Sequence, residues 1–85
     1  MNPPRIVERI QTGVRLEKSL LKVLKGLAEY CDMSLGDLLE GIVLHSFEGK
    51  APFSEETLAT IRDLKKVYNC KLMAADSHSL AENPS

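Results

Sequence analysis

The alternation of apolar and polar residues near the start of the chain predicts one short β-strand. One face would carry Thr12, Val14 and Leu16, and the other would carry Gln11, Gly13 and Arg15. This period of two is typical of a half-buried strand, which we place at residues 9–16. The sequence contains no second strand-like run. Because a lone strand leaves its backbone groups unpaired, we expect it to pair with the same strand of a second copy.

A helix is predicted over residues 18–31, directly after the strand. Its apolar residues recur at spacings of three and four, which places them on one face of a helix. They are Leu20, Leu21, Leu24, Leu27, Ala28 and Cys31. Gly26 lowers the helix propensity and leaves room for another backbone to come close. Asp32 and Met33 form a short break after the helix.

A second helix is predicted to begin after Ser34, a favoured residue at the N-cap position. Asp37 follows three residues later, so the segment is close to a capping box. The predicted buried face consists of Leu35, Leu38, Leu39, Ile42, Val43 and Phe47. Gly49 is expected to cap the C-terminal end, because glycine readily adopts the left-handed conformation found there.

A third helix is predicted over residues 55–69, after an interruption at Pro52. Ser54 is its expected N-cap. Its apolar stripe consists of Leu58, Ile61, Leu64 or Lys65, and Tyr68. The expected organisation is a flexible N-terminal arm at residues 1–8, a core at residues 9–49, and a C-terminal helix and tail at residues 50–85.

The order of amphipathic strand, helix, tight break and capped second helix resembles the ribbon-helix-helix family of DNA-binding proteins, which includes the Arc, MetJ and CopG repressors and many antitoxins. The residues that carry the resemblance are Gln11-Thr12-Gly13-Val14-Arg15-Leu16, Leu21, Leu24, Ala28 and Met33-Ser34-Leu35. The resemblance implies a mainly α homodimer over residues 9–49. Two strands would pair into an antiparallel ribbon above four interlocked helices, with the third helix of each chain as an addition.

In DNA-binding members of this family the ribbon enters the major groove, and its outward side chains contact the bases. The resemblance assigns these positions to Gln11, Gly13 and Arg15. Arginine can donate two hydrogen bonds to guanine and glutamine can pair with adenine, each pair being worth about 1–3 kcal/mol of discrimination. Gly13 departs from the pattern because it has no side chain. It either allows a very close approach to DNA or indicates that the ribbon recognises no sequence.

The resemblance also assigns phosphate contacts to Ser34 and Leu35, at the start of the second helix. Free N–H groups and the helix dipole attract anions at such a position. We expect further phosphate contacts at Lys18 and Lys25. No basic residue adjoins Ser34, however, and Asp37 lies close by, so the expected phosphate affinity is modest.

The net charge of −1 is not typical of a general nucleic-acid binder, but its distribution is uneven. Residues 1–18 carry four basic and two acidic side chains, whereas residues 19–49 carry two basic and five acidic ones. The basic excess therefore falls on the predicted strand and its flanks.

Nothing in the sequence points to catalysis. It contains no glycine-rich phosphate loop, paired-carboxylate motif or nucleophile motif, so we expect no enzyme and no cofactor. Cys31 and Cys70 lack the spacing of metal ligands, and we expect two reduced thiols and no metal. No apolar run is typical of a signal peptide or a membrane span, so we expect a cytoplasmic protein without membrane contact.

Two hypotheses about function follow, beside a structural alternative in which the C-terminal helix folds back and makes a helical monomer with no ribbon. The first is a homodimeric, sequence-specific DNA-binding transcription regulator, either a repressor or an antitoxin-like autoregulator with a toxin as protein partner. The second is a dimeric protein-interaction module that does not bind DNA and uses the C-terminal helix to dock a partner. The negative net charge, Gly13 and the lack of a basic residue near Ser34 favour the second.

Overall fold

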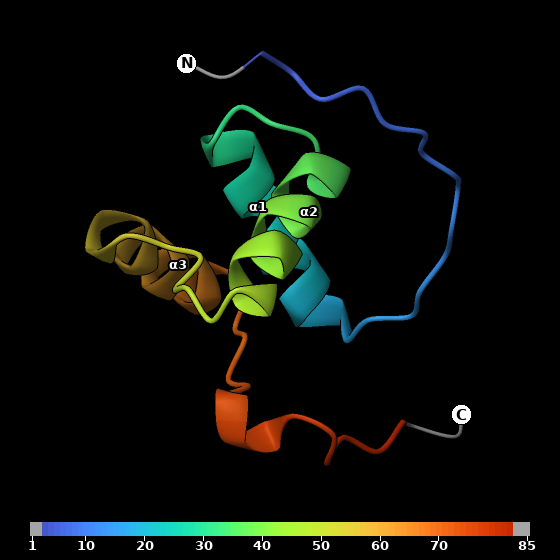
Figure 1. Ribbon diagram of the computed structural model, residues 1–85. Coiled ribbons are helices and arrows are strands. Elements are labelled where there is room, and N and C mark those ends of the chain that lie inside the picture. Colours follow the sequence, from blue (N-terminus) through green and yellow to red (C-terminus); the bar gives the residue numbers. More distant parts are fainter. Residues whose placement is uncertain (1–2, 83–85) are drawn as a thin grey trace.

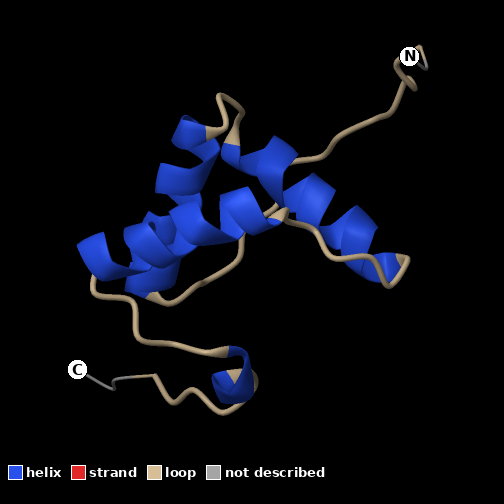
Figure 2. Ribbon diagram, turned by 90° about the vertical axis from the view of Figure 1, so that its left-hand side faces the viewer, coloured by secondary structure: helices blue, strands red, loops and turns tan. Residues whose placement is uncertain are grey.

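A computed structural model describes residues 3–82 of the chain (Figure 1). An arm at residues 3–17 leads into three α-helices and one short 3-10 helix. The elements are α1 (Lys18–Tyr30), α2 (Leu35–Phe47), α3 (Glu55–Val67) and η1 (Ala74–Asp76). Helices are the only regular elements within residues 3–82 (Figure 2). The prediction of a mainly α chain is confirmed, and the three predicted helices are present.

Two serines begin α2 and α3, as predicted. Ser34 Oγ accepts a hydrogen bond from the N–H of Asp37 at 3.1 Å. Ser54 Oγ accepts one from the N–H of Thr57 at 3.2 Å. Each bond satisfies one of the N–H groups that the first turn of a helix leaves without a partner, which fixes where the helix starts.

Glu17 begins α1, a role that the sequence pattern did not indicate. Its Oε1 accepts hydrogen bonds from the Ser19 hydroxyl at 2.6 Å and from the N–H of Leu20 at 2.9 Å. These bonds, the one from the Ser19 hydroxyl above all, hold the pKa of Glu17 below its ordinary value. The negative charge is also favourable beside the positive end of the helix dipole.

All three α-helices end in the same way, with a residue in the left-handed conformation. These residues are Asp32, Gly49 and Asn69, with φ of 59°, 70° and 55°. The next amide in each case donates back to the last turn: Met33 to Ala28 O at 3.0 Å, Lys50 to His45 O at 2.9 Å and Cys70 to Lys65 O at 2.8 Å. This Schellman arrangement turns the chain sharply after each helix. The prediction that Gly49 caps the second helix is confirmed.

The small core is built around α1, which contacts both α2 and α3 (Figure 1). Its centre consists of Leu27 and Ala28 from α1 and Leu38 from α2. Partly buried side chains surround it: Leu24, Cys31, Ile42, Phe53, Ile61 and Leu64. Within residues 3–82 only five apolar residues are buried: Val23, Leu27, Ala28, Leu38 and Cys70.

Gly26 is the point where α3 docks onto α1. A Cβ atom at this position would lie 3.2 Å from Leu64 Cδ2 and 3.4 Å from Tyr68 Cε2. A larger residue would hold α3 away from α1, because protein interiors are packed too tightly to absorb extra atoms. We expected Gly26 to let another backbone come close, but the atoms beside it belong to the side chains of Leu64 in α3 and Tyr68 at its C-terminal end.

The predicted strand at residues 9–16 is wrong, and so is the ribbon-helix-helix homodimer built on it. No residue within 3–82 forms a strand, and residues 3–17 instead run as an extended arm beside the helices (Figure 2). Within residues 3–82, no second segment pairs with the arm to form a sheet. In addition, α3 packs on α1 within the chain, as in the alternative in which the C-terminal helix folds back without a ribbon.

The predicted burial of the helices is also only partly right. In α1, Val23 is buried although the stripe did not include it, because α3 covers a second side of this helix. In α2, Leu38 is buried as predicted, but Val43 is 42% exposed and Phe47 is 82% exposed. The apolar residues of α2 therefore lie on more than one side, and only one side meets the core.

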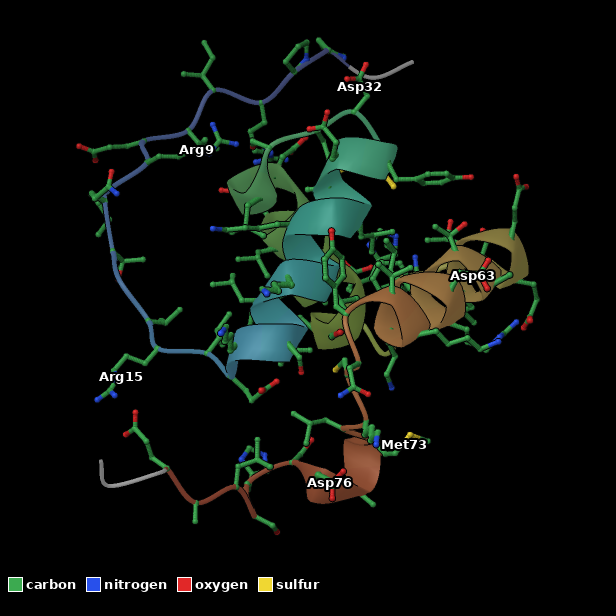
Figure 3. All side chains as sticks on the ribbon, turned by 180° about the vertical axis from the view of Figure 1, so that it is seen from behind. Arg9, Arg15, Asp32, Asp63, Met73 and Asp76 are labelled. Carbon is green, nitrogen blue, oxygen red and sulfur yellow. The ribbon has the colours of Figure 1, made fainter. Side chains whose placement is uncertain are left out.

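Residues 1–2 and 83–85 lie outside the described part of the chain, so the predicted arm at residues 1–8 and the predicted tail are covered only in part. After α3, the Lys65 ammonium group donates to the carbonyl oxygen of Leu72 at 2.6 Å and ties the start of the tail to the helix. The N–H of Met73 donates to Asp76 Oδ2 at 2.8 Å and closes η1 (Figure 3).

Replacing Gly26 with leucine should lower the free energy of unfolding by about 1–3 kcal/mol, the usual cost of overpacking. The matched control is Gly41→Leu, because no described atom lies within 4 Å of a Cβ built at Gly41. That change should instead raise stability by up to about 1 kcal/mol through helix propensity. Urea unfolding followed by circular dichroism measures both values. Equal losses in the two variants would contradict the docking of α3 at Gly26.

Candidate interaction surface

The arm is the most open part of the described chain. Every residue from 3 to 18 is exposed. This includes apolar side chains that a folded protein usually covers: Ile6 is 98% exposed, Ile10 83% and Val14 74%. Among the described residues, no backbone hydrogen bond involves residues 3–16. The arm therefore presents both apolar side chains and free backbone groups to its surroundings.

One ion pair ties the middle of the arm to α2. Arg9 Nε and Nη2 donate to the two carboxylate oxygens of Glu40 at 2.9 Å and 2.8 Å (Figure 3). This two-pronged geometry is the strongest form that an arginine–carboxylate pair takes. The hydrogen bond holds the pKa of Glu40 below its ordinary value and raises the pKa of Arg9.

A second ion pair joins the arm to the tail. Arg15 donates to Glu82 Oε1, and in Figure 3 the Arg15 side chain points toward the C-terminal segment. Both side chains are largely exposed, at 84% and 68%. Pairs this open contribute little to stability, because water and salt screen them. Arg15 is therefore accessible, but its charge has a carboxylate beside it.

The three positions predicted to contact bases lie next to one another on the exposed arm. Gln11 and Arg15 are exposed, and no described atom lies within 4 Å of a Cβ built at Gly13. These three residues lie on the single arm and not on the paired ribbon that was predicted. Lys18 is exposed in the first turn of α1 and Lys25 is exposed two turns later. The structure thus puts the cationic candidates along the arm and α1.

The two other predicted phosphate-contacting residues lie at the start of α2, away from those lysines in sequence. The Ser34 hydroxyl already accepts the N–H of Asp37 as a helix cap, and Leu35 is half-buried. A groove of about 760 Å³ separates this helix start from the arm. It is lined by Glu8, Arg9, Ile10, Thr12, Ser34, Gly36, Asp37, Leu39 and Glu40. Three carboxylates against one arginine make the groove acidic, which disfavours a phosphate group.

The outer face of α2, formed by Leu39, Val43, Leu44 and Phe47, is the largest feature that the sequence interpretation missed. Val43 is 42% exposed, Leu44 65% and Phe47 82%, while Leu39 is half-buried beside the arm. Such a helix is apolar on two sides but covered on one. Helices that are apolar around most of their surface normally lie inside a larger assembly. The sequence did contain a signal for this surface, because α2 has more apolar residues than one face of a helix can hold.

A second, smaller groove of about 330 Å³ runs along α2, between the end of α1 and the start of α3, and Cys31, Phe53 and His45 help to line it. His45 Nδ1 lies 2.7 Å from Gly41 O, which is its own helix backbone. Cys31 and Cys70 are free thiols. Among residues 3–82, no cluster of three or more His, Cys, Asp or Glu side chains is placed to hold a metal ion. Within the same range, no helix has the length and apolar character needed to cross a membrane.

No protein-family model, curated protein or solved structure matches this chain.

Replacing Arg9 with glutamine should raise the pKa of Glu40 toward its ordinary value of about 4.3. Because the ion pair lowers the pKa of Glu40, the pair holds the arm fully when the pH is above the ordinary pKa of a glutamate. This contribution is lost as the pH falls through the lowered pKa of Glu40. NMR titration of the Glu40 side-chain carboxyl measures the shift. The pKa of Glu17 is the internal control, since hydrogen bonds from Ser19 and Leu20 lower it instead. An unchanged Glu40 pKa in the variant would show that the pair does not form in solution.

Proposed function

We propose that this chain acts by binding rather than by catalysis, as a protein-interaction module whose binding surface is the outer face of α2. The observation that carries the proposal is the exposure of Val43, Leu44 and Phe47 on a helix whose other side is already packed in the core. Several exposed apolar side chains on one helix of a small protein are typical of a site of protein contact.

The expected gain from covering this face is large for so small a protein. Fully burying a valine, leucine or phenylalanine side chain contributes about 1.5–3 kcal/mol each. Phe47 projects from the last turn of the helix at 82% exposure, so a partner could bury nearly all of it. Aromatic side chains in the centre of an interface commonly dominate its binding energy.

The docking element differs from the one that the sequence favoured. The C-terminal helix, α3, directs Leu64 and Tyr68 onto α1 at Gly26, so its apolar side is occupied within the chain. Its remaining surface includes Arg62, Asp63 and Lys66, which are exposed and charged. The helix with an apolar side still open is α2.

A photoreactive residue tests the surface directly. With p-benzoylphenylalanine in place of Val43, irradiation of cells that produce the chain should yield a covalent protein adduct, whose composition peptide mass spectrometry identifies. The control places the same residue at Val67 of α3, which is 71% exposed but lies outside the outer face of α2. An adduct from Val43 that disappears with Phe47→Glu in the same chain supports the proposal. No adduct from Val43, or equal adducts from both positions, would overturn it.

Binding of duplex DNA through the arm is the second candidate. The observation in its favour is the continuous exposure of Gln11, Gly13 and Arg15 on a segment that leads to Lys18 without any covering element. Against it, Glu40 and Glu82 neutralise Arg9 and Arg15, so DNA must compete with carboxylates for both arginines.

Fluorescence polarisation with a duplex selected from a random pool tests the DNA candidate. Arg15→Ala should weaken binding about 5- to 150-fold at fixed salt, the effect of losing one bidentate base contact. Arg62→Ala is the matched control, because Arg62 is an exposed arginine on α3. If no duplex binds the unmodified chain at micromolar concentration and low salt, or if both variants weaken binding equally, the DNA candidate is wrong.

A further inference from the structure

We infer that the groove between the arm and the start of α2 holds a short, extended and positively charged segment of a partner protein. The groove encloses about 760 Å³, and its lining shares only Leu39 with the outer face of α2. The inference goes beyond the proposed function and does not rest on it, because Val43, Leu44 and Phe47 do not line the groove. Three features of the described residues carry it: the free backbone of one wall, the apolar side chains of both walls, and the negative charge of the lining.

The arm forms one wall of the groove as an extended backbone (Figure 2). Glu8, Arg9, Ile10 and Thr12 line this wall, and among the described residues no backbone hydrogen bond involves residues 3–16. Backbone N–H and C=O groups need partners wherever a contact excludes water. An extended partner segment laid along the arm supplies both kinds of partner, which is how main-chain recognition of peptides gains its affinity. Residues 8–12 span at most about 18 Å, so the wall accommodates about five extended residues.

The start of α2 forms the opposite wall and leaves space for side chains of the bound segment. Gly36 lines the groove, and no described atom lies within 4 Å of a Cβ built at this position. Leu39 is half-buried on the same wall, while Ile10 on the arm is 83% exposed. Apolar side chains of a bound segment would cover both residues, and removing apolar area from water favours binding.

The charge of the lining selects a cationic segment. Three carboxylates and one arginine leave the lining residues with a net charge of −2. Arg9 donates to both oxygens of Glu40, whereas neither Glu8 nor Asp37 forms an ion pair with a described residue. The positive end of the α2 dipole, equivalent to about half a charge, offsets only part of this. Lysine or arginine side chains therefore match the groove, and an acidic segment is repelled.

The spread of the carboxylates favours a chain with several charges over a single metal ion. Among residues 3–82, no three His, Cys, Asp or Glu side chains are placed together to hold a metal. Glu8 lies on the arm and Asp37 on α2, so the two carboxylates come from opposite walls. Successive basic side chains of an extended segment point to opposite sides, which suits carboxylates on both walls.

NMR titration of the full chain with a seven-residue peptide of alternating lysine and valine tests the inference. The peptide should shift the backbone amide signals of residues 8–12 and 36–40, because these line the two walls. It should saturate those shifts at millimolar concentration or below. A peptide of the same length with glutamate in place of lysine is the control and should shift neither set of signals.

Two matched pairs of variants locate the binding. Glu8→Gln combined with Asp37→Asn should raise the dissociation constant of the lysine peptide about 2- to 30-fold, as for the loss of two exposed ion pairs. Glu29→Gln combined with Asp63→Asn removes the same charge from exposed carboxylates outside the groove and should leave the constant unchanged.

The second pair tests the space in the groove without changing any charge. Gly36→Leu fills the space and should weaken binding about 5- to 150-fold, the effect of overpacking. Gly41→Leu is the control, since Gly41 also has open space around it but does not line this groove. Both changes favour the helix, so circular dichroism should show an intact fold.

The outcomes decide the inference without touching the proposed function. Shifts at both walls that the groove variants weaken and the control variants do not weaken support it. It is overturned by the absence of shifts at millimolar peptide, by equal binding of the glutamate peptide, or by equal weakening in groove and control variants. In each of these cases the interaction function of the outer face of α2 is still decided by the Val43 adduct alone.

Discussion

The packing of α3 against α1 at Gly26 determines what the rest of this chain can do. With no side chain at Gly26, the Leu64 and Tyr68 side chains come within contact of α1 and cover a second side of it. Val23 is buried as a result, and α1 becomes the helix with neighbours on two sides. The contacts of α2 with other helices are made to α1, and Val43, Leu44 and Phe47 of α2 stay exposed. The candidate binding surface therefore lies on the helix that does not pack against α3.

The arm is attached to α2 by an ion pair, and little of its apolar surface is covered. Ile6 and Ile10 are almost entirely exposed, while Val7 and Leu16 are partly covered, at 53% and 40% exposure. The two-pronged pair between Arg9 and Glu40 therefore sets its position along α2, and pairs between exposed groups weaken with added salt. The helical core and the arm should respond differently to solution conditions, since the core depends on apolar contacts that salt does not screen.

Local features of this fold were predictable from the sequence, and features that depend on distant segments were not. The caps at Ser34, Ser54 and Gly49 involve bonds within a few residues, so short patterns identify them. The alternation at residues 11–16 is equally local, but a strand exists only where a partner backbone is present. The alternation correctly indicated that the segment is extended, but it gave no information on whether another backbone lies beside it.

Burial is non-local in the same sense. The stripe on α2 correctly included Leu38, yet Val43 and Phe47 have the same apolar character and face away from the core. Helical periodicity reports which positions are apolar and does not report how many neighbours are available to cover them. On α1, the neighbour that covers the second side is α3, and its close approach depends on Gly26, beside which Leu64 lies.

The balance between protein and DNA as the partner follows from where the carboxylates lie. A DNA-binding surface needs uncompensated positive charge, because release of counterions from the phosphates provides most of the sequence-independent affinity. Here Glu40 and Glu82 stand beside the two arginines that would supply it, and the groove below the arm is acidic. The outer face of α2 faces no such competition, since burial of Val43 and Phe47 displaces only water. A protein partner therefore gains binding energy without first breaking a contact that the chain already makes, whereas DNA must break two.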